Sequence, residues 1–282
     1  TRRQRFVRAR PPAWGGRASP RPPRCRLVGF ARRGETVSQA GISRGKPFPL
    51  GATPSLEGVN FSVWARDATS MELCLFDRAE DGRPSRVVAL EPSRHRSYHY
   101  WHVLVPGVGP GQRYGWRARG PFDPSRGLRF DPHKLLLDPY GRAVAVPPGY
   151  DRQAACRPGD NAGAAMKSVV ADLSRYDWEG DAPLRRPFSR TVVYELHVRG
   201  FTRHPSSGVS EARRGTYAGL AEKIPHLRAL GVTAVELMPV FQFDAQDAPA
   251  GLTNYWGYSP VGFFAPHAAY AAARGQIGRA HV

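Results

Sequence analysis

Residues 191–198 read Thr-Val-Val-Tyr-Glu-Leu-His-Val, a dense run of β-branched, aromatic and aliphatic side chains. Such a run is typical of a strand that is buried on both faces of a sheet. Apolar residues then recur at helical spacing from position 217 to position 227, and a second dense run covers residues 233–240. Strand, helix and strand in this order predict a βαβ unit, and therefore a parallel sheet.

The helical stretch carries its own start and stop signals. Thr216 is placed to cap its beginning, and Gly231 is placed to close its end. Pro225 lacks the amide that the helical ladder needs, so it should divide the stretch into two short helices. Near the end of the chain, residues 268–274 read as the beginning of a further helix.

The chain before residue 146 has a different hydrophobic pattern. Apolar and polar residues alternate in several short runs separated by turn signals, which is the pattern of half-buried strands. Several such strands over about a hundred residues predict a β-sandwich. The runs are residues 60–65, 71–76, 87–90, 99–105 and 113–119.

The remaining segments are expected to lie outside the two folded parts. Residues 1–45 form a basic tail rich in Arg, Pro and Gly, which we predict to be disordered. That tail is either upstream sequence translated by accident or a plastid transit peptide. Residues 146–188 are predicted to be a linker. Residues 277–282 are predicted to be non-native, because they match a reading frame of a common sequencing adapter.

The net charge of +18 does not indicate a nucleic-acid partner. The first 46 residues hold thirteen of the 41 basic residues and a single acidic residue, Glu35, so the body is nearly balanced. A clustered basic face is what such binding requires.

No stretch approaches the roughly 20 apolar residues of a membrane span. Cys25, Cys74 and Cys156 form no CxxC pair, so neither a zinc site nor a disulfide framework is indicated, and no metal or cofactor is expected.

Three motifs occur in order in the second half of the chain, at residues 193–202, at residues 234–244, and at residues 254–260 with 263–266 behind them. Together they resemble the α-amylase superfamily, glycoside hydrolase family 13, in its isoamylase and glycogen-debranching form. Upstream, residues 58–65, 114–117 and 131–141 resemble the carbohydrate-binding module of family 48.

The resemblance implies an all-β sandwich followed by the start of an α/β barrel, a (β/α)8 TIM barrel that stops after about two βα units. The sandwich is expected over residues 46–145 and the barrel part over residues 189–276. The chain is then an N-terminal fragment of the parent enzyme.

The resemblance also implies where the chemistry lies. A retaining glycosidase needs two carboxylates about 5 Å apart, and in the family these sit on later strands, so this chain has no assignable catalytic residue. Glu195 and Glu236 fall inside predicted strands, whereas barrel active sites are built at the carboxyl rim.

Substrate contacts are implied on the loop after the second strand. Tyr258 is the aromatic that would stack under a glucose, because a pyranose presents a flat row of C–H groups. Asn254 and Trp256 are further candidates, with loop packing as the alternative. In the sandwich, Trp64, Trp101 and Trp116 are candidates for glucan binding, with a place in the core as the alternative.

The parent is therefore expected to hydrolyse α-1,6 branch linkages in glycogen, amylopectin or limit dextrins, and this chain to be inactive alone. The alternatives are a non-catalytic glucan-binding module, and another family 13 enzyme such as a branching enzyme. A bacterial cytoplasm is expected, with the plastid stroma as the alternative, and the oligomeric state is left open.

Overall fold

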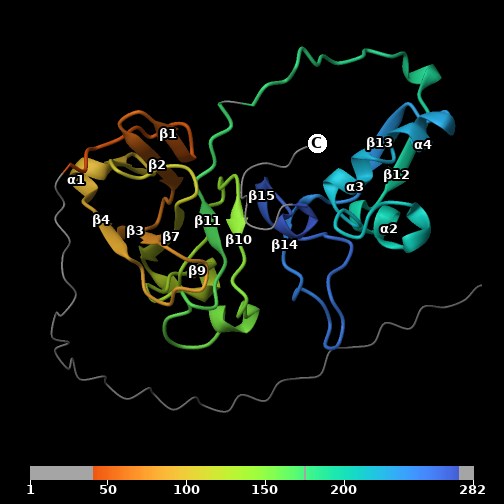
Figure 1. The fold of residues 1–282 in the computed structure, drawn as a ribbon. Coiled ribbons are helices and arrows are strands. Elements are labelled where there is room, and N and C mark those ends of the chain that lie inside the picture. The colour runs from red at the N-terminus through yellow and green to blue at the C-terminus, as the bar shows by residue number, and fades with distance from the viewer. Residues whose placement is uncertain (1–40, 175, 273–282) are drawn as a thin grey trace, which may run out of the picture. The chain divides into compact units, whose positions relative to one another are not determined.

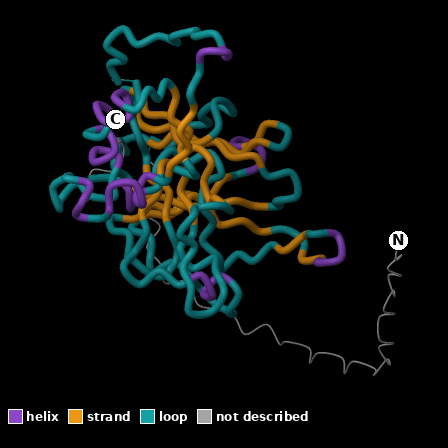
Figure 2. The backbone as a smooth tube through the Cα atoms, turned by 90° about the vertical axis from the view of Figure 1, so that its right-hand side faces the viewer, coloured by secondary structure: helices purple, strands orange, loops and turns teal. Residues whose placement is uncertain are grey.

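The computed structural model of the chain describes residues 41–174 and 176–272. Two antiparallel sheets form its first part (Figures 1 and 2). One has the strand order β1-β2-β6-β5 and the other β10-β11-β7-β3-β4. The first sheet comprises β1 Gly51–Ser55, β2 Gly58–Trp64, β6 Tyr100–Val105 and β5 Arg96–Ser97, and the second comprises β10 Val144–Ala145, β11 Lys167–Val169, β7 Arg113–Arg119, β3 Ser70–Phe76 and β4 Arg86–Leu90.

The two sheets face each other across a hydrophobic core, which confirms the predicted sandwich. Phe61 of β2 meets Tyr114 of β7 edge to face, with ring centres 4.9 Å apart. Trp101 and Trp116 are almost fully buried in the same core. All five predicted strand runs form strands, because each places its apolar residues on the face that meets the other sheet.

Small elements complete this part of the chain. A short helix precedes β5, and a two-stranded hairpin with a 3-10 turn at its tip extends beyond β7. These are α1 Pro92–His95, β8 Phe122–Asp123, η1 Pro124–Arg126 and β9 Leu128–Arg129. Gly58 opens β2 with φ of 138°, and a Cβ there would lie 2.3 Å from the carbonyl oxygen of Val105, so only glycine fits.

Two segments outside the predicted sandwich nevertheless join it. The stretch expected as a linker contains β11, which pairs with β7 in the second sheet, so residues 146–188 are not free of regular structure. In the expected basic tail, Ser43 forms a β-bridge with Leu104. Short, Gly- and Pro-rich surroundings hide such strands from pattern analysis. The rest of the predicted tail, residues 1–40, and residues 277–282 lie outside the described residues.

The second part of the described chain contains the predicted βαβ unit. β12 Val193–Leu196 pairs in parallel with β13 Ala234–Leu237. Pro225 does divide the helical stretch, giving α3 Tyr217–Ala221 and α4 Ile224–Ala229. Thr216 caps α3 by accepting a hydrogen bond from the amide of Gly219, as predicted. The remaining elements are η2 Arg152–Ala155, η3 Phe188–Arg190, α2 Val198–Arg203, η4 Pro205–Ser207, β14 Phe241–Phe243, β15 Pro260–Pro266 and η5 Ala268–Tyr270.

The prediction that both strands are buried on both faces is wrong for this chain. Val193 and Val235 are 50% and 42% exposed. The reason is that β12 and β13 pair only with each other within the described ranges. The first strand is also shorter than expected, since Val198 already belongs to α2. Two parallel strands are established, but a barrel is not.

Candidate functional site

Exposed aromatic rings gather on the loop between β14 and β15. Tyr255, Trp256 and Tyr258 are 45%, 62% and 55% exposed. The rings of Trp256 and Tyr258 lie 6.5 Å apart at 41° to each other. This loop contacts His197 at the carboxyl end of β12, the edge of a parallel sheet at which ligands are bound. The loop therefore presents aromatic faces at the edge where a substrate is expected.

Asn254 holds this loop in shape from the inside. Its side-chain nitrogen donates to the carbonyl oxygens of Tyr258 at 2.8 Å and Asp244 at 3.3 Å. Its side-chain oxygen accepts from the amide of Gly257 at 3.1 Å. Both ends of the amide are thus engaged within the loop, and only this orientation of the amide satisfies all three contacts. The geometry favours the packing alternative for Asn254.

Gly257 lets the loop approach the strand beneath it. It has φ of 82°, and a Cβ there would lie 2.9 Å from the ring of Phe243 and 3.1 Å from the carbonyl oxygen of Pro239. A side chain at this position would therefore push the loop outward. The backbone conformation of Gly257 therefore fixes the orientation of the neighbouring Trp256 and Tyr258 side chains.

His197 links the same loop to the end of β12. Its Nδ1 accepts from the amide of Gly200 at 3.0 Å, so the proton is on Nε2, which donates to the carbonyl oxygen of Tyr255 at 2.8 Å. The imidazole also stacks on the Tyr255 ring, with centres 4.3 Å apart and planes at 10°. The hydroxyl of Tyr270 lies 3.2 Å from the same Nε2. His197 thus connects the carboxyl end of β12 to the loop at Tyr255 and to Tyr270 of η5.

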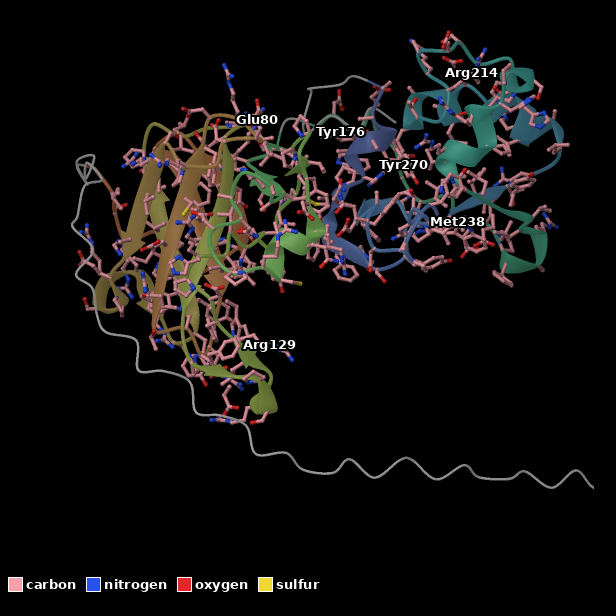
Figure 3. The ribbon with its side chains drawn as sticks, turned by 90° about the horizontal axis from the view of Figure 1, so that it is seen from below. Glu80, Arg129, Tyr176, Arg214, Met238 and Tyr270 are labelled. Atoms are coloured by element: carbon pink, nitrogen blue, oxygen red, sulfur yellow. The ribbon has the colours of Figure 1, made fainter. Side chains whose placement is uncertain are left out.

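A buried aromatic cluster supports this arrangement from below. His267 stacks on Phe243 at 3.8 Å, and Tyr270 meets His267 edge to face at 4.6 Å (Tyr270 is labelled in Figure 3). Burial lowers the pKa of His267 from 6.5 to about 4, and the positive charge of Arg199 acts in the same direction. Burial likewise raises the pKa of Tyr270 to about 12. The cluster is therefore neutral at physiological pH.

Asp244 attaches the start of the loop to the segment after β10. Its Oδ2 accepts from the hydroxyl of Tyr150 and from Nη1 of Arg152, both at 2.7 Å. The side chain of Asp244 is 2% exposed, whereas that of Arg152 is 41% exposed. Gln246 adds two bonds, donating to the carbonyl oxygen of Tyr150 and accepting from the amide of Arg152, each at 2.8 Å. Because the carboxylate is buried, these donors fix the loop's starting point firmly.

The two carboxylates singled out inside the strands lie where they were expected. Glu195 and Glu236 are register partners in the middle of β12 and β13, away from the carboxyl edge, and both are exposed. Within the described part of the chain no group of three or more His, Cys, Asp or Glu residues could hold a metal ion.

The three candidate tryptophans of the sandwich separate clearly. Trp101 is fully buried, and its Nε1 donates to the carbonyl oxygen of Ala65 at 3.2 Å. Trp116 is 1% exposed, so both belong to the core, as the packing alternative predicted. Trp64 at the end of β2 is 50% exposed. Of the three, Trp64 alone is accessible to a ligand.

The sandwich is similar to a known family of domains. Residues 49–141 match the family described as carbohydrate-binding module 48, the isoamylase N-terminal domain. The match covers β1 to β9 of the sandwich.

The similarity to known proteins extends well beyond this domain. The chain is 46% identical to the "Glycogen operon protein GlgX homolog" of Mycobacterium tuberculosis over 247 residues, which cover 82% of this chain and 33% of the relative. It is 43% identical to a "Glycogen debranching enzyme" of Serratia proteamaculans, over 83% of this chain and 35% of the relative. "Isoamylase 1, chloroplastic" of Arabidopsis thaliana is 39% identical, over 82% and 30% respectively. The resemblance to isoamylase-type debranching enzymes is confirmed, and the chain spans about a third of these relatives' length.

Solved structures of other proteins are similar in fold to this chain. An apo pullulanase from Paenibacillus barengoltzii matches with a TM-score of 0.60 and 26% identity, over 81% of this chain and 34% of that chain. The catalytic module of the pneumococcal glycogen-degrading factor SpuA matches with a TM-score of 0.63 and 22% identity, over 84% and 34%. The latter similarity concerns the fold alone.

No sequence pattern indicated a role for His197, Tyr255 or Asp244, although the contacts of all three hold the loop in place. A signal existed for two of them: His197 directly follows β12 and Asp244 directly follows β14, so each sits where a strand ends. For Tyr255 no separate signal distinguished it from its aromatic neighbours.

Proposed function

We propose that this chain is part of an enzyme that hydrolyses the α-1,6 branch linkages of glycogen or starch dextrins. The identity of 43–46% to GlgX-type and debranching proteins over more than four fifths of the chain carries the proposal. A retaining mechanism through a covalent glycosyl-enzyme intermediate follows from the family resemblance. The chain belongs in the bacterial cytoplasm on this account, with the plastid stroma as the alternative that the Arabidopsis relative supports.

Residues 189–276 are, in this proposal, the first units of a (β/α)8 barrel. The parallel pairing of β12 and β13 supports it, and so does the exposure of their apolar residues, which further strands would cover. Within the described residues no helix is long and apolar enough to cross a membrane. The boundary at 188 is proposed on the strand pairing, whereas the pairing of β11 with β7 carries the sandwich past residue 145.

Tyr258 is the proposed platform under a glucose ring, and Trp256 borders it. Their exposure and the bracing of the loop by Asn254 and His197 support this assignment. Asn254 acts as a positioning residue, since its amide is engaged in the loop. The catalytic carboxylates lie in the part of the relatives' length that this chain does not span.

The test uses glycogen, pullulan and unbranched amylose as substrates. The purified 282-residue chain should release no reducing ends from any of them. A protein extended to the full reading frame should release them from glycogen and pullulan, and not from amylose. Transfer of chains without net release of reducing ends would show a branching enzyme instead and refute the proposal.

A glucan-binding protein without catalysis is the second candidate. The family 48 match over residues 49–141 and the exposed Trp64 favour it. If the extended protein binds glycogen but hydrolyses none of the three substrates, this second function replaces the first.

A further inference from the structure

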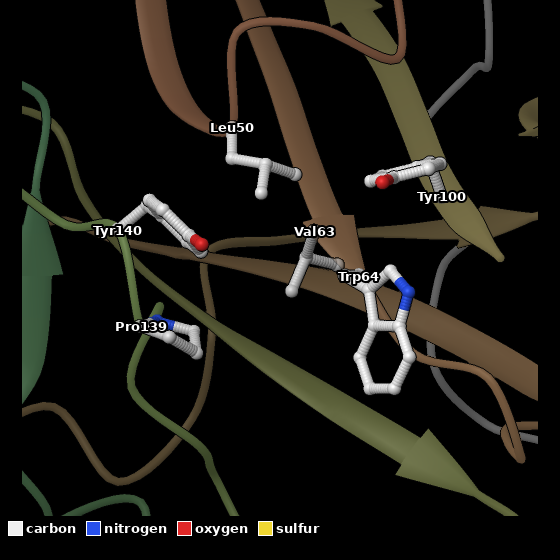
Figure 4. Close-up of a pocket in the computed structure, with 6 residues that line it drawn as sticks. All are labelled: Leu50, Val63, Trp64, Tyr100, Pro139 and Tyr140. Carbon is white, nitrogen blue, oxygen red and sulfur yellow. The ribbon is translucent and has the colours of Figure 1, made fainter.

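The hairpin of β14 and β15 is held by the sandwich as well as by the βαβ unit. Val144 of β10, Met166 before β11 and Ala265 of β15 are buried in one apolar cluster. The ring of Tyr140, which also lines a small groove on the sandwich (Figure 4), stacks on Phe264 of β15 with centres 5.1 Å apart. Apolar contacts have no preferred direction, so they do not by themselves fix the position of the hairpin closely.

Directional contacts to the hairpin come from the loop between β10 and β11, residues 146–166. Arg152, in η2 of this loop, donates from Nη1 to Oδ2 of Asp244 at 2.7 Å, and its Nη2 lies 3.1 Å from Oδ1 of Asp247. One guanidinium therefore bridges two carboxylates at the start of the aromatic loop, in a fork that an ammonium group does not offer. The side chain of Asp244 is 2% exposed, so water cannot readily replace its donors.

The backbone that carries Arg152 is itself fixed to the sandwich. Lys134 is 9% exposed, and its ammonium group donates to the carbonyl oxygens of Ala154 at 3.2 Å and Gly159 at 2.7 Å. Asp151 caps η2 by accepting a hydrogen bond from the amide of Gln153 at 2.8 Å. Because a buried ammonium group loses much free energy when its acceptors move away, these contacts keep η2 in place.

From Asp244 the hydrogen bonds continue to Tyr258. The carbonyl oxygen of Asp244 accepts from Nδ2 of Asn254 at 3.3 Å, and the same nitrogen donates to the carbonyl oxygen of Tyr258 at 2.8 Å. The backbone amide of Asn254 also donates to the carbonyl oxygen of Ala245 at 3.0 Å. A continuous path of contacts thus leads from Arg152 of the sandwich to the backbone of Tyr258.

We propose that Arg152 is a positioning residue for Tyr258, acting through Asp244 and Asn254. This inference rests on the proposed function, because Tyr258 is the platform under a glucose ring only there. Arg152 touches no substrate. The sandwich thereby contributes to turnover by fixing the orientation of an aromatic ring on the neighbouring hairpin, without binding a ligand itself. A merely stabilising Arg152 would change the resistance to unfolding and leave the loop conformation of the folded chain as it is.

The first experiment is fluorine NMR of the 282-residue chain labelled with 5-fluorotryptophan. The ring of Trp256 lies 6.5 Å from that of Tyr258, so its resonance, identified by its loss in Trp256→Phe, reports on the loop. Arg152→Met should shift or broaden this resonance and speed amide exchange at residues 251–258 by about tenfold. Arg152→Lys should restore the parent spectrum in part. The resonance of the buried Trp101 should stay unchanged, which checks that the sandwich is folded.

Arg157→Met is the matched control, because Arg157 lies just after η2 and forms an ion pair with Asp151 instead of with the hairpin. It should leave the Trp256 resonance and the exchange of residues 251–258 as in the parent chain. The proposal is overturned if Arg152→Met also leaves both unchanged, or if the two variants alter them equally. Should Arg152→Met not fold, Arg152→Lys and Arg157→Lys are compared by the same criteria.

The second experiment is a double-mutant cycle in the protein extended to the full reading frame, with pullulan as substrate. Arg152→Met should lower kcat/KM by about tenfold or more. In a Tyr258→Ala background the same substitution should lower it by less than about twofold, because the ring that Arg152 positions is gone. Equal losses in both backgrounds would show a merely structural role and overturn the proposal. Failure of the proposed function looks different: no variant releases reducing ends, while the Trp256 resonance still responds to Arg152→Met.

Discussion

Acidification should destabilise the hydrogen-bonded region around His267 in a way that one substitution removes. The imidazole is 7% exposed, stacks on Phe243, and has no hydrogen-bond partner on Nδ1. The guanidinium of Arg199 is close enough to disfavour a positive charge on the imidazole. The pKa of His267 is therefore about 4 in the folded chain, against 6.5 for the free side chain.

The direction in which stability changes with pH follows from proton binding. Between these two values the unfolded chain binds the proton and the folded chain does not, so stability falls as the pH is lowered from about 6.5 and levels off below about 4. The difference between these two pKa values corresponds to about 3 kcal/mol in total, of which about 2 kcal/mol is lost by pH 5.

The assay is urea unfolding at pH 7.5, 6, 5 and 4.5 for the parent chain and for His267→Gln. Amide exchange at residues 240–270 shows whether the loss is local. The difference in free energy between the two proteins should shrink by about 2 kcal/mol from pH 7.5 to pH 5, because Gln does not titrate. A pH-independent difference between parent and His267→Gln would refute the reasoning, even though other groups titrate in this range.

Three further predictions test the packing. Trp101→Ala should lower the free energy of unfolding by about 3–5 kcal/mol and Trp64→Ala by less than about 1 kcal/mol, and equal losses in urea unfolding would contradict their different burial. Thr216→Ala should cost about 1 kcal/mol, seen as faster amide exchange in α3 with no change in the sandwich. Asp244→Asn should cost about 1–3 kcal/mol in thermal unfolding, whereas Asp67→Asn in the exposed pair with Arg66 should leave thermal unfolding unchanged; similar losses would mean that the buried carboxylate is not held by its donors.

The sandwich could be predicted from the sequence because its strands carry a period-two pattern that one core enforces. Residues 113–119 show this well: Tyr114, Trp116 and Ala118 were expected on one face, and all three are buried. The helix breaks at Pro225 and the cap at Thr216 were equally local signals. Each of these features is decided within a few residues of chain.

Burial of β12 and β13 could not be predicted, because it depends on neighbours rather than on the strand itself. The runs have the composition of buried strands, but in the described chain Val193 and Val235 have no further strand or layer over them. The same limit applies to the site. His197 and Asp244 act through partners 58 and 94 residues away, and no local pattern reports such distances.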